Sequence, residues 1–196
     1  MAGYRRGNDA LSQPTAPLYG GKRHVTPKIL RCLTFPPPQG DGAAMVPYRM
    51  TAKDDWAAVL ALLTRAFAGM DGRIDPPSSL HTLTVEGLQT GGEVWVLGTP
   101  PVACMILTPH AGHLYLGKLA VDPAMHRKGL ARILVSHAEA RARALRLPCI
   151  TLQTRVELTE NHRVFTRLGF TQTAATSHQG YTRPTSLTFT KEVPLA

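Results

Sequence analysis

Cysteine and long apolar runs are scarce in this sequence of 196 residues. The three cysteines, Cys32, Cys104 and Cys149, are odd in number, far apart and never in a CxxC pair, which argues against a disulfide framework and a cysteine-based zinc site. No apolar run approaches the roughly 20 residues that span a bilayer. The first 30 residues contain no apolar core of a secretory signal, and none follows the Arg5-Arg6 pair. We therefore expect a cytoplasmic protein in a reducing compartment, without a membrane partner.

Acidic residues are also few, because 13 Asp and Glu stand against 22 Lys and Arg and give a net charge of +9. Residues 1–45 contain six of the basic and two of the acidic residues, so the remainder carries a net charge of +5. A modestly basic domain suits a polyanionic small ligand as well as a nucleic acid. Single-strand binding requires aromatic side chains interleaved with basic ones, and neither this interleaving nor a recognition motif is present. We therefore expect no nucleic-acid partner.

The composition changes near Met45. Residues 1–44 show no sustained period of 2 or 3.6 and are rich in proline and glycine, including the triplet Pro36-Pro37-Pro38. Such a segment gains too little from burial to offset the entropy lost on ordering. We expect residues 1–45 to be a basic N-terminal extension that is either disordered or translated from a start upstream of the true one at Met45. Residues 46–196 are expected to form the folded domain.

Beyond Met45 the apolar pattern is regular and predicts seven strands and four helices. The first helix is expected to begin with a capping box formed by Thr51 and Asp54. The element order βααβββαβαββ predicts an α/β (or α+β) domain with a mixed, mostly antiparallel central sheet of about seven strands, flanked by about four helices. The strands are expected over 46–50, 93–97, 102–107, 113–121, 150–154, 170–175 and 186–193, and the helices over 53–68, 78–89, 129–145 and 160–168.

The strand over 113–121 changes phase in its middle. Apolar residues occupy even positions up to Leu116 and odd positions from Leu119 onward. Because side chains alternate along a strand, this slip indicates one inserted residue, a β-bulge near Gly117-Lys118. A bulge leaves backbone N–H and C=O groups free to bind a ligand. The alternative is a chance pattern in a strand that is buried on both faces.

A tight turn at Pro123 and a basic loop follow this strand. Gly129 stands at the expected start of the next helix, where the absence of a Cβ lets the backbone approach a ligand. The free amides of a first helical turn and the helix dipole favour an anion at such a point. Arg127, Lys128 and Arg132 add positive charge. Strand, bulge, turn and loop together predict a pyrophosphate-binding site.

Two blocks of residues resemble the GNAT-type N-acetyltransferases. Leu119-Ala120-Val121-Asp122-Pro123 followed by His126-x-x-Gly129-x-Ala131 resembles the family's acetyl-CoA signature, Arg/Gln-x-x-Gly-x-Gly/Ala. Thr159-Glu160-Asn161 through Phe165 to Leu168-Gly169-Phe170 is similar to the second block, an Asn-containing helix that ends in Gly-Phe. The likeness extends over about residues 46–193.

The resemblance implies a GNAT-like fold in which the bulged strand parts from the strand over 150–154, as a splayed parallel pair. It implies that the pantetheine of acetyl-CoA lies in this gap and that the acetyl group passes directly to a primary amine of a small molecule or peptide. The residues that it assigns to the cofactor are Leu119, Ala120, Val121, Arg127, Lys128, Gly129, Leu130, Ala131, Arg132, Asn161 and Phe165.

Three positions depart from the family pattern. His126 stands where Arg or Gln is usual, although the cofactor cradle uses mainly backbone groups. Phe165 replaces a tyrosine thought to protonate the leaving thiolate in many members, and Gln153 replaces a glutamate that serves some members as base. Glu157 and Glu160 are the candidates for proton transfer, each with a purely structural role near a helix start as the alternative. These departures also leave open a non-catalytic acyl-CoA-binding module.

Five further side chains have simpler interpretations. The pair His110-x-x-His113 has the spacing of metal ligands but no third ligand nearby, so no metal is expected. Cys104 and, likewise, Cys149 are placed in strands and are expected to be small core residues rather than nucleophiles. Arg141 falls in the apolar sector of its helix, which indicates either snorkelling near the helix end or pairing with an acid.

The acceptor is not identified by any motif. The resemblance implies that residues 69–92 and the loop around 176–185 determine the acceptor. Both segments are rich in Gly, Pro, Ser and Thr. The sequence also leaves a homodimer open.

Overall fold

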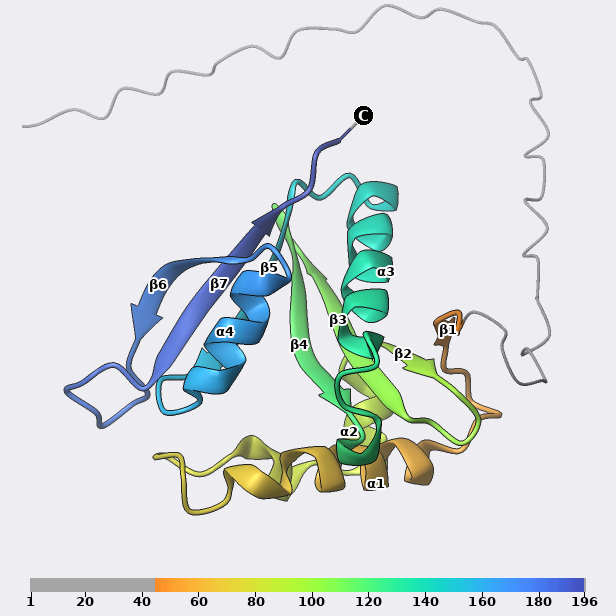
Figure 1. Cartoon of the computed structure of the whole chain (residues 1–196), viewed down its shortest axis with the longest axis horizontal. Helices are drawn as coiled ribbons and strands as arrows, with labels where there is room; N and C mark the ends of the chain where they lie inside the picture. Colours follow the sequence, from red (N-terminus) through yellow and green to blue (C-terminus); the bar gives the residue numbers. More distant parts are fainter. Residues whose placement is uncertain (1–44, 196) are drawn as a thin grey trace, which may run out of the picture. The chain divides into compact units, whose positions relative to one another are not determined.

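A computed structural model describes residues 45–195, in which a seven-stranded sheet has the order β1-β2-β3-β4-β5-β7-β6 (Figure 1). Within this part of the chain β4 and β5 are the one parallel pair, and the other neighbouring strands are antiparallel. The predicted mixed, mostly antiparallel sheet is confirmed. The predictions of disorder and of an upstream start concern residues 1–44, which lie outside the described residues.

The predicted elements are present, most of them with their ends shifted by one to three residues. The strands are β1 Tyr48–Arg49, β2 Glu93–Leu97, β3 Ala103–His110, β4 His113–Val121, β5 Cys149–Arg155, β6 Thr171–Thr176 and β7 Ser186–Glu192. The helices are α1 Trp56–Phe67, α2 Val85–Thr90, α3 Leu130–Ala144 and α4 Thr159–Arg167, with 3-10 turns at Ala68–Met70, Ser79–Thr82 and Pro123–Met125. None of the helices described here has both the length and the apolarity to cross a membrane.

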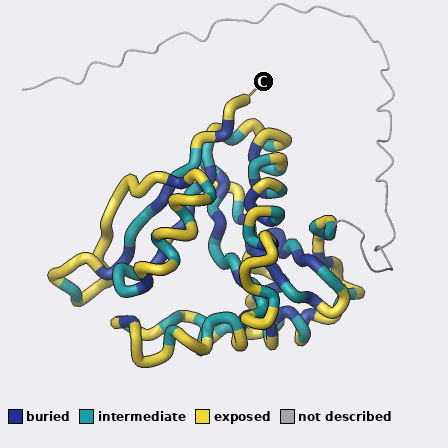
Figure 2. The backbone as a smooth tube through the Cα atoms, viewed as in Figure 1, coloured by how far each residue is buried: buried dark blue, intermediate teal, exposed yellow. Residues whose placement is uncertain are grey.

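Helices pack on both faces of the sheet, and the buried backbone runs along its central strands (Figure 2). On one face, Leu134 of α3 and Met105 of β3 belong to one apolar cluster. On the other face, Leu62 of α1 and Leu88 of α2 pack with Ile106 of β3. Burial of each such side chain contributes about 1.5–3 kcal/mol. The adjacent β3 residues Met105 and Ile106 therefore pack against helices on opposite faces of the sheet.

The β-bulge predicted near Gly117-Lys118 is present in β4. Ile106 of β3 pairs with Lys118 and Leu107 pairs with Leu116, so Gly117 is the inserted residue. The apolar side chains before and after Gly117 consequently pack against the same core on the α3 side. The change of phase in the sequence therefore corresponds to this bulge, and the alternative of a chance pattern in a buried strand is wrong.

The parallel pair β4 and β5 is splayed, as expected. The two strands pair only at Leu114 with Ile150 and at Tyr115 with Thr151, although β4 continues to Val121. Figure 1 shows them separating from a common end. Beyond Tyr115 the edges that face each other have no ladder hydrogen bonds between them, so their backbone groups are available to a ligand.

Capping interactions explain where the helices differ from prediction. The helix expected over 78–89 is instead a 3-10 turn and a separate α2, because the Thr84 hydroxyl caps α2 by accepting from the Gly87 amide at 3.1 Å. Thr51 and Asp54 do bond to each other, at 2.6 Å from amide to carboxylate. The helix nevertheless begins one turn later, with Asp55 as its cap.

Strand β1 is shorter than predicted and pairs with β2 at Tyr48 and Arg49. Just beyond the strand, the Met50 amide donates to the Val94 carbonyl oxygen of β2 at 2.8 Å.

Arg141 of α3 pairs with an acid, one of the two interpretations of its position in the apolar sector. Its Nε and Nη2 atoms donate to the two carboxylate oxygens of Glu93, at 2.9 and 2.6 Å. The indole Nε1 of Trp95 donates to Glu93 Oε2 at 3.2 Å, and Glu93 is only 8% exposed. This bidentate pair fastens α3 to β2.

Candidate active site

Two cavities adjoin where β4 and β5 separate. The larger has a volume of about 650 Å³ and the smaller about 220 Å³. Both are bounded by the end of α1, by the bulged half of β4 and by α4. The side chains that line both are Phe67, Met70, Leu119, Leu158, Asn161 and Phe165. A molecule in one cavity can therefore contact a molecule in the other at the bulge.

The larger cavity gathers most of the residues that the sequence assigned to the cofactor. Ten of the eleven line it: Leu119, Ala120, Val121, Arg127, Gly129, Leu130, Ala131, Arg132, Asn161 and Phe165. Lys128 does not, and its Nζ atom instead lies 3.2 Å from Met125 Sδ. The signature loop, the end of β4 and α4 thus surround one space.

Gly129 forms the N-terminus of α3 in a conformation that favours glycine. Its φ is +79°, and no side chain caps the helix. The first intrahelical bond runs from the Ile133 amide to the Gly129 carbonyl at 3.1 Å, so the amides before Ile133 have no partner in the helix. A Cβ at Gly129 would meet no atom within 4 Å. Open space therefore lies in front of a turn of free, partly positive N–H groups.

Asp122 holds the loop that leads to Gly129. One carboxylate oxygen accepts from the Ala124 amide at 3.0 Å, and the other accepts from Arg65 of α1 at 3.0 Å. The hydrogen bond from Ala124 and then that from Arg65 lower the pKa of Asp122, so the carboxylate stays ionised at neutral pH. His126, at the departure from the family pattern, has its Nε2 atom 3.1 Å from the Val121 carbonyl oxygen. The loop is thus held at its start by α1 and β4.

The charge of the larger cavity is positive. Four arginines line it: Arg73, Arg127, Arg132 and Arg167. Among residues 45–195 Glu160 is the one carboxylate that lines it, and its Oε1 accepts from Arg73 at 2.6 Å. A backbone hydrogen bond and then the Arg73 bond lower the pKa of Glu160. Free amides, an open cradle and excess positive charge together fit the diphosphate of coenzyme A.

Sequence reasoning missed several residues of this cavity. Phe67 and Met70 come from the end of α1 and the turn after it, and Arg73 follows them. Only the apolar period of α1 pointed to Phe67, and that period indicates core rather than ligand contact. Arg167 lies within the second family block but was not singled out. These residues enter the site through tertiary packing.

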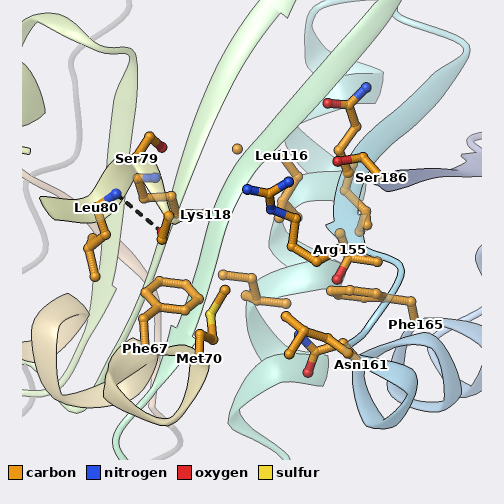
Figure 3. A pocket seen from close by; sticks show the side chains of 17 residues that line it. Phe67, Met70, Ser79, Leu80, Leu116, Lys118, Arg155, Asn161, Phe165 and Ser186 are labelled. Carbon is orange, nitrogen blue, oxygen red and sulfur yellow. Dashed lines mark hydrogen bonds between the residues drawn. The ribbon is translucent and has the colours of Figure 1, made fainter. Parts of the chain in front are cut away.

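The smaller cavity lies between β4, β5 and the segment after α1 (Figure 3). Lys118 lies on the side of Ser79 and Leu80, and Arg155 on the side of Ser186 and Phe165. Among the described residues no Asp or Glu lines it. Gln153, where some family members have glutamate, lines it and lies 3.4 Å from Thr188 Oγ1.

Residues 69–92 and 176–185, which the resemblance implicates in acceptor selection, are bonded to each other beside the smaller cavity. The Tyr181 hydroxyl donates to Asp75, and Arg183 donates to the same carboxylate at 3.3 Å. Arg183 also lies 3.7 Å from Glu157, in the turn between β5 and α4. These bonds hold the two segments together at the cavity edge.

The two glutamates considered for proton transfer have different surroundings. Glu157 lines neither cavity, but its neighbour Leu158 lines both, and its buried Oε2 atom has no hydrogen-bond partner among the described residues. Glu160 lines the larger cavity in its ion pair with Arg73. Phe165, at the tyrosine position, packs against Phe170 and Phe189 with ring centroids 6.1 and 6.0 Å apart.

The remaining candidates lie away from both cavities. His110 and His113 stack across the β3–β4 turn at 5.1 Å, and residues 45–195 contain no cluster of three or more metal-ligating side chains. Cys104 is fully buried, and burial raises the pKa of its thiol to about 12. Such a thiol is a core residue rather than a nucleophile.

Comparison with curated proteins finds no match. Comparison with solved structures finds proteins of the same fold. Among solved structures, the ribosomal-protein-S18-alanine N-acetyltransferase of Escherichia coli superposes with a TM-score of 0.61 at 19% identity, over 78% of this chain and 96% of that one. A GNAT family acetyltransferase from Elizabethkingia anophelis, with acetyl-CoA bound, gives 0.59 at 17% identity, over 76% and 97%. At these identities the structures establish a shared fold.

The family itself is established by the sequence. Residues 56–170, more than half of the chain, match the model of the acetyltransferase (GNAT) family. The match extends from α1 through the signature loop and α4 to the Gly169-Phe170 pair, and so includes both cavities' main walls. The chain therefore belongs to the acetyltransferase (GNAT) family.

Proposed function

We propose that this protein transfers the acetyl group of acetyl-CoA to a primary amine by direct attack. The observation that carries the proposal is the meeting of two cavities at the β4 bulge: one suits a diphosphate-bearing cofactor, and the other is small and polar. The Escherichia coli structure with this fold is named as an N-acetyltransferase, which supports an amine acceptor.

The chain's own residues would hold acetyl-CoA in the larger cavity. The amides at the start of α3, with Arg127 and Arg132, would bind the diphosphate. The unpaired edge of β4 beyond Tyr115 would hydrogen-bond the pantetheine. An amide of this edge would stabilise the negative charge that develops on the thioester carbonyl oxygen when the amine attacks. When bound, acetyl-CoA supplies an acetyl group activated as a thioester.

The amine must lose a proton before it attacks. For an alkyl amine of pKa near 10 this costs about 4 kcal/mol at pH 7, at 1.36 kcal/mol per pH unit. Of the two candidates, Glu157 is the better proton acceptor, because its Oε2 is unpartnered among the described residues. The backbone hydrogen bond and the bond from Arg73 lower the pKa of Glu160 and so make it a weaker base. Since Glu157 lines neither cavity, we propose that the proton reaches it through water.

Replacing Glu157 by glutamine is expected to lower kcat about tenfold, a modest loss for a base that acts through water. The loss should shrink as the pH rises, because more of the amine is then already deprotonated. The measurement is kcat against pH, with Glu192→Gln as a control that makes the same change at the exposed end of β7. A loss that is the same at all pH values, or that also appears in Glu192→Gln, would contradict this role.

The proposed function is tested by calorimetric titration with acetyl-CoA, together with thiol release over a panel of amines. Micromolar binding accompanied by thiol release with at least one amine supports it. Binding with no turnover of any amine would favour a non-catalytic acyl-CoA-binding module instead. Absence of binding to acetyl-CoA and to coenzyme A would contradict both functions.

A further inference from the structure

The charged side chains that line the smaller cavity, among the described residues, are all positive. Its charged lining residues are Lys118 from the β4 bulge and Arg155 from the end of β5. Two carboxylates lie close to these residues in the chain: Asp75 precedes Pro76, which accepts from Arg155, and Glu157 precedes Leu158 of the lining. Both lie against Arg183, at 3.3 and 3.7 Å. The two cations are therefore not neutralised by an acid of the cavity wall.

Lys118 is placed in the cavity by the bulge. The inserted Gly117 shifts the phase of β4, and Lys118 lies half-buried beside the gap between β4 and β5. Its ammonium group makes no hydrogen bond or ion pair with any residue between 45 and 195. Burial lowers the pKa of Lys118, as expected for an ammonium group that has lost water without gaining a partner.

Arg155 is fixed by its neighbours, and none of them is acidic. Its Nη2 atom donates to the carbonyl oxygens of Pro76 and of Pro77, the latter at 3.2 Å, and its Nη1 atom lies 3.0 Å from His178 Nδ1. These contacts hold the guanidinium in place without neutralising its charge. The hydroxyl residues Ser79 and Ser186 lie nearby in the lining.

We propose that the acceptor amine also carries a carboxylate, which Lys118 and Arg155 bind, and that it is a free amino acid or a similarly small amino acid derivative. The inference rests on the proposed function and names its substrate class. Pairs of a cation and a carboxylate are among the stronger hydrogen-bonded contacts. The cavity volume of about 220 Å³ is below the ~300–1,000 Å³ of pockets for drug-sized ligands, which favours a metabolite of amino acid size.

The same charges disfavour polycationic acceptors. A polyamine or aminoglycoside would bring several ammonium groups to a wall without carboxylates. For an amino acid, by contrast, the carboxylate binds the cations, and the nearby positive charge lowers the pKa of its own ammonium group. Lys118 and Arg155 would thus assist release of the proton that direct attack requires.

The test compares each acceptor with its uncharged analogue. L-leucine, L-leucinamide and isopentylamine, and the corresponding sets for other amino acids, are assayed by thiol release at fixed acetyl-CoA. We expect kcat/KM for the best amino acid to exceed that for its amide by at least tenfold, because the amide cannot form a charged hydrogen bond with Lys118 or Arg155. Lys118→Met should remove this preference, Lys118→Arg should restore part of it, and Lys53→Met, at an exposed lysine before α1, should retain it.

Each outcome has a distinct meaning. The carboxylate site would be overturned if amides or decarboxylated amines had the same kcat/KM as the amino acids, or if Lys118→Met kept the preference for amino acids. The acetyltransferase function would stand in either case. Turnover confined to peptides with a free N-terminus would also overturn the carboxylate site. If no amine is turned over, calorimetry with the amino acids decides, since binding that Lys118→Met weakens about tenfold supports the site and absence of binding overturns it.

Discussion

Replacing Gly129 by valine is expected to lower the affinity for acetyl-CoA about 100-fold and also to destabilise the fold. The φ of +79° is strained for any other residue by about 1–2 kcal/mol and more for a β-branched one. The new side chain also projects into the open space in front of the α3 amides, where no protein atom lies within 4 Å. A bound diphosphate and a valine side chain would compete for that space. The measurement is the Kd for acetyl-CoA by calorimetry.

The chain offers a matched control for this substitution. Gly112, in the turn between β3 and β4, has a φ of +82° and likewise no atom within 4 Å of a Cβ. Gly112→Val therefore introduces the same backbone strain into an equally open position that lines neither cavity. We expect similar losses of melting temperature in the two variants and a normal Kd in Gly112→Val. Similar affinities in both variants would show that Gly129 does not lie against the cofactor.

Two local rules made much of this fold predictable from the sequence. The strict alternation of side chains in a strand turns one inserted residue into a visible phase slip, and this located the bulge near Gly117-Lys118, where the structure has it at Gly117. Glycine's tolerance of positive φ, next to basic residues after a strand, likewise marked the start of α3 at Gly129. The wall of the larger cavity between Leu119 and Arg132 lies close together in the sequence and was predictable for this reason, whereas the wall from α1 and the turn after it was not.

The acceptor side was not predictable, because its residues meet only through the fold. Lys118 had been noted for its backbone alone, and Arg155 acquires its position from the carbonyl oxygens of Pro76 and Pro77, 78 or more residues earlier in the chain. No spacing in the sequence reports contacts at that separation. The break between the 3-10 turn and α2 was missed for a different reason. Thr84 is compatible with a helix by pattern, and its role as a cap depends on the extended backbone at Leu83.

Arg141→Met is expected to lower the free energy of unfolding by about 3 kcal/mol at pH 7, because the carboxylate of Glu93 stays buried after losing its bidentate partner. Glu93 would keep its burial, the 3.2 Å bond from Trp95 and Arg49 at 3.7 Å, but would lose both bonds from the guanidinium. Urea unfolding measures the change. Arg143→Met is the matched control on the same helix, because its 3.4 Å contact with Glu139 is at the surface and such pairs contribute about 0.3–0.5 kcal/mol.

The pH dependence should distinguish a lost ion pair from lost packing. Burial alone would raise the pKa of Glu93, but the hydrogen bonds from Arg141 and Trp95 outweigh burial and lower it. The stabilisation by the pair is therefore present above the pKa of the unfolded state and is lost as the pH falls through the pKa of the folded state. Without Arg141, burial dominates and the pKa rises. In the wild type, burial and then Arg141 also lower the pKa of His137, which packs against Trp95. In the variant, either Glu93 or His137 therefore binds a proton more readily in the folded state. The deficit of Arg141→Met relative to Arg143→Met should therefore be smaller at pH 5 than at pH 7, whereas a deficit independent of pH would mean that Arg141 stabilises the fold through its packing alone.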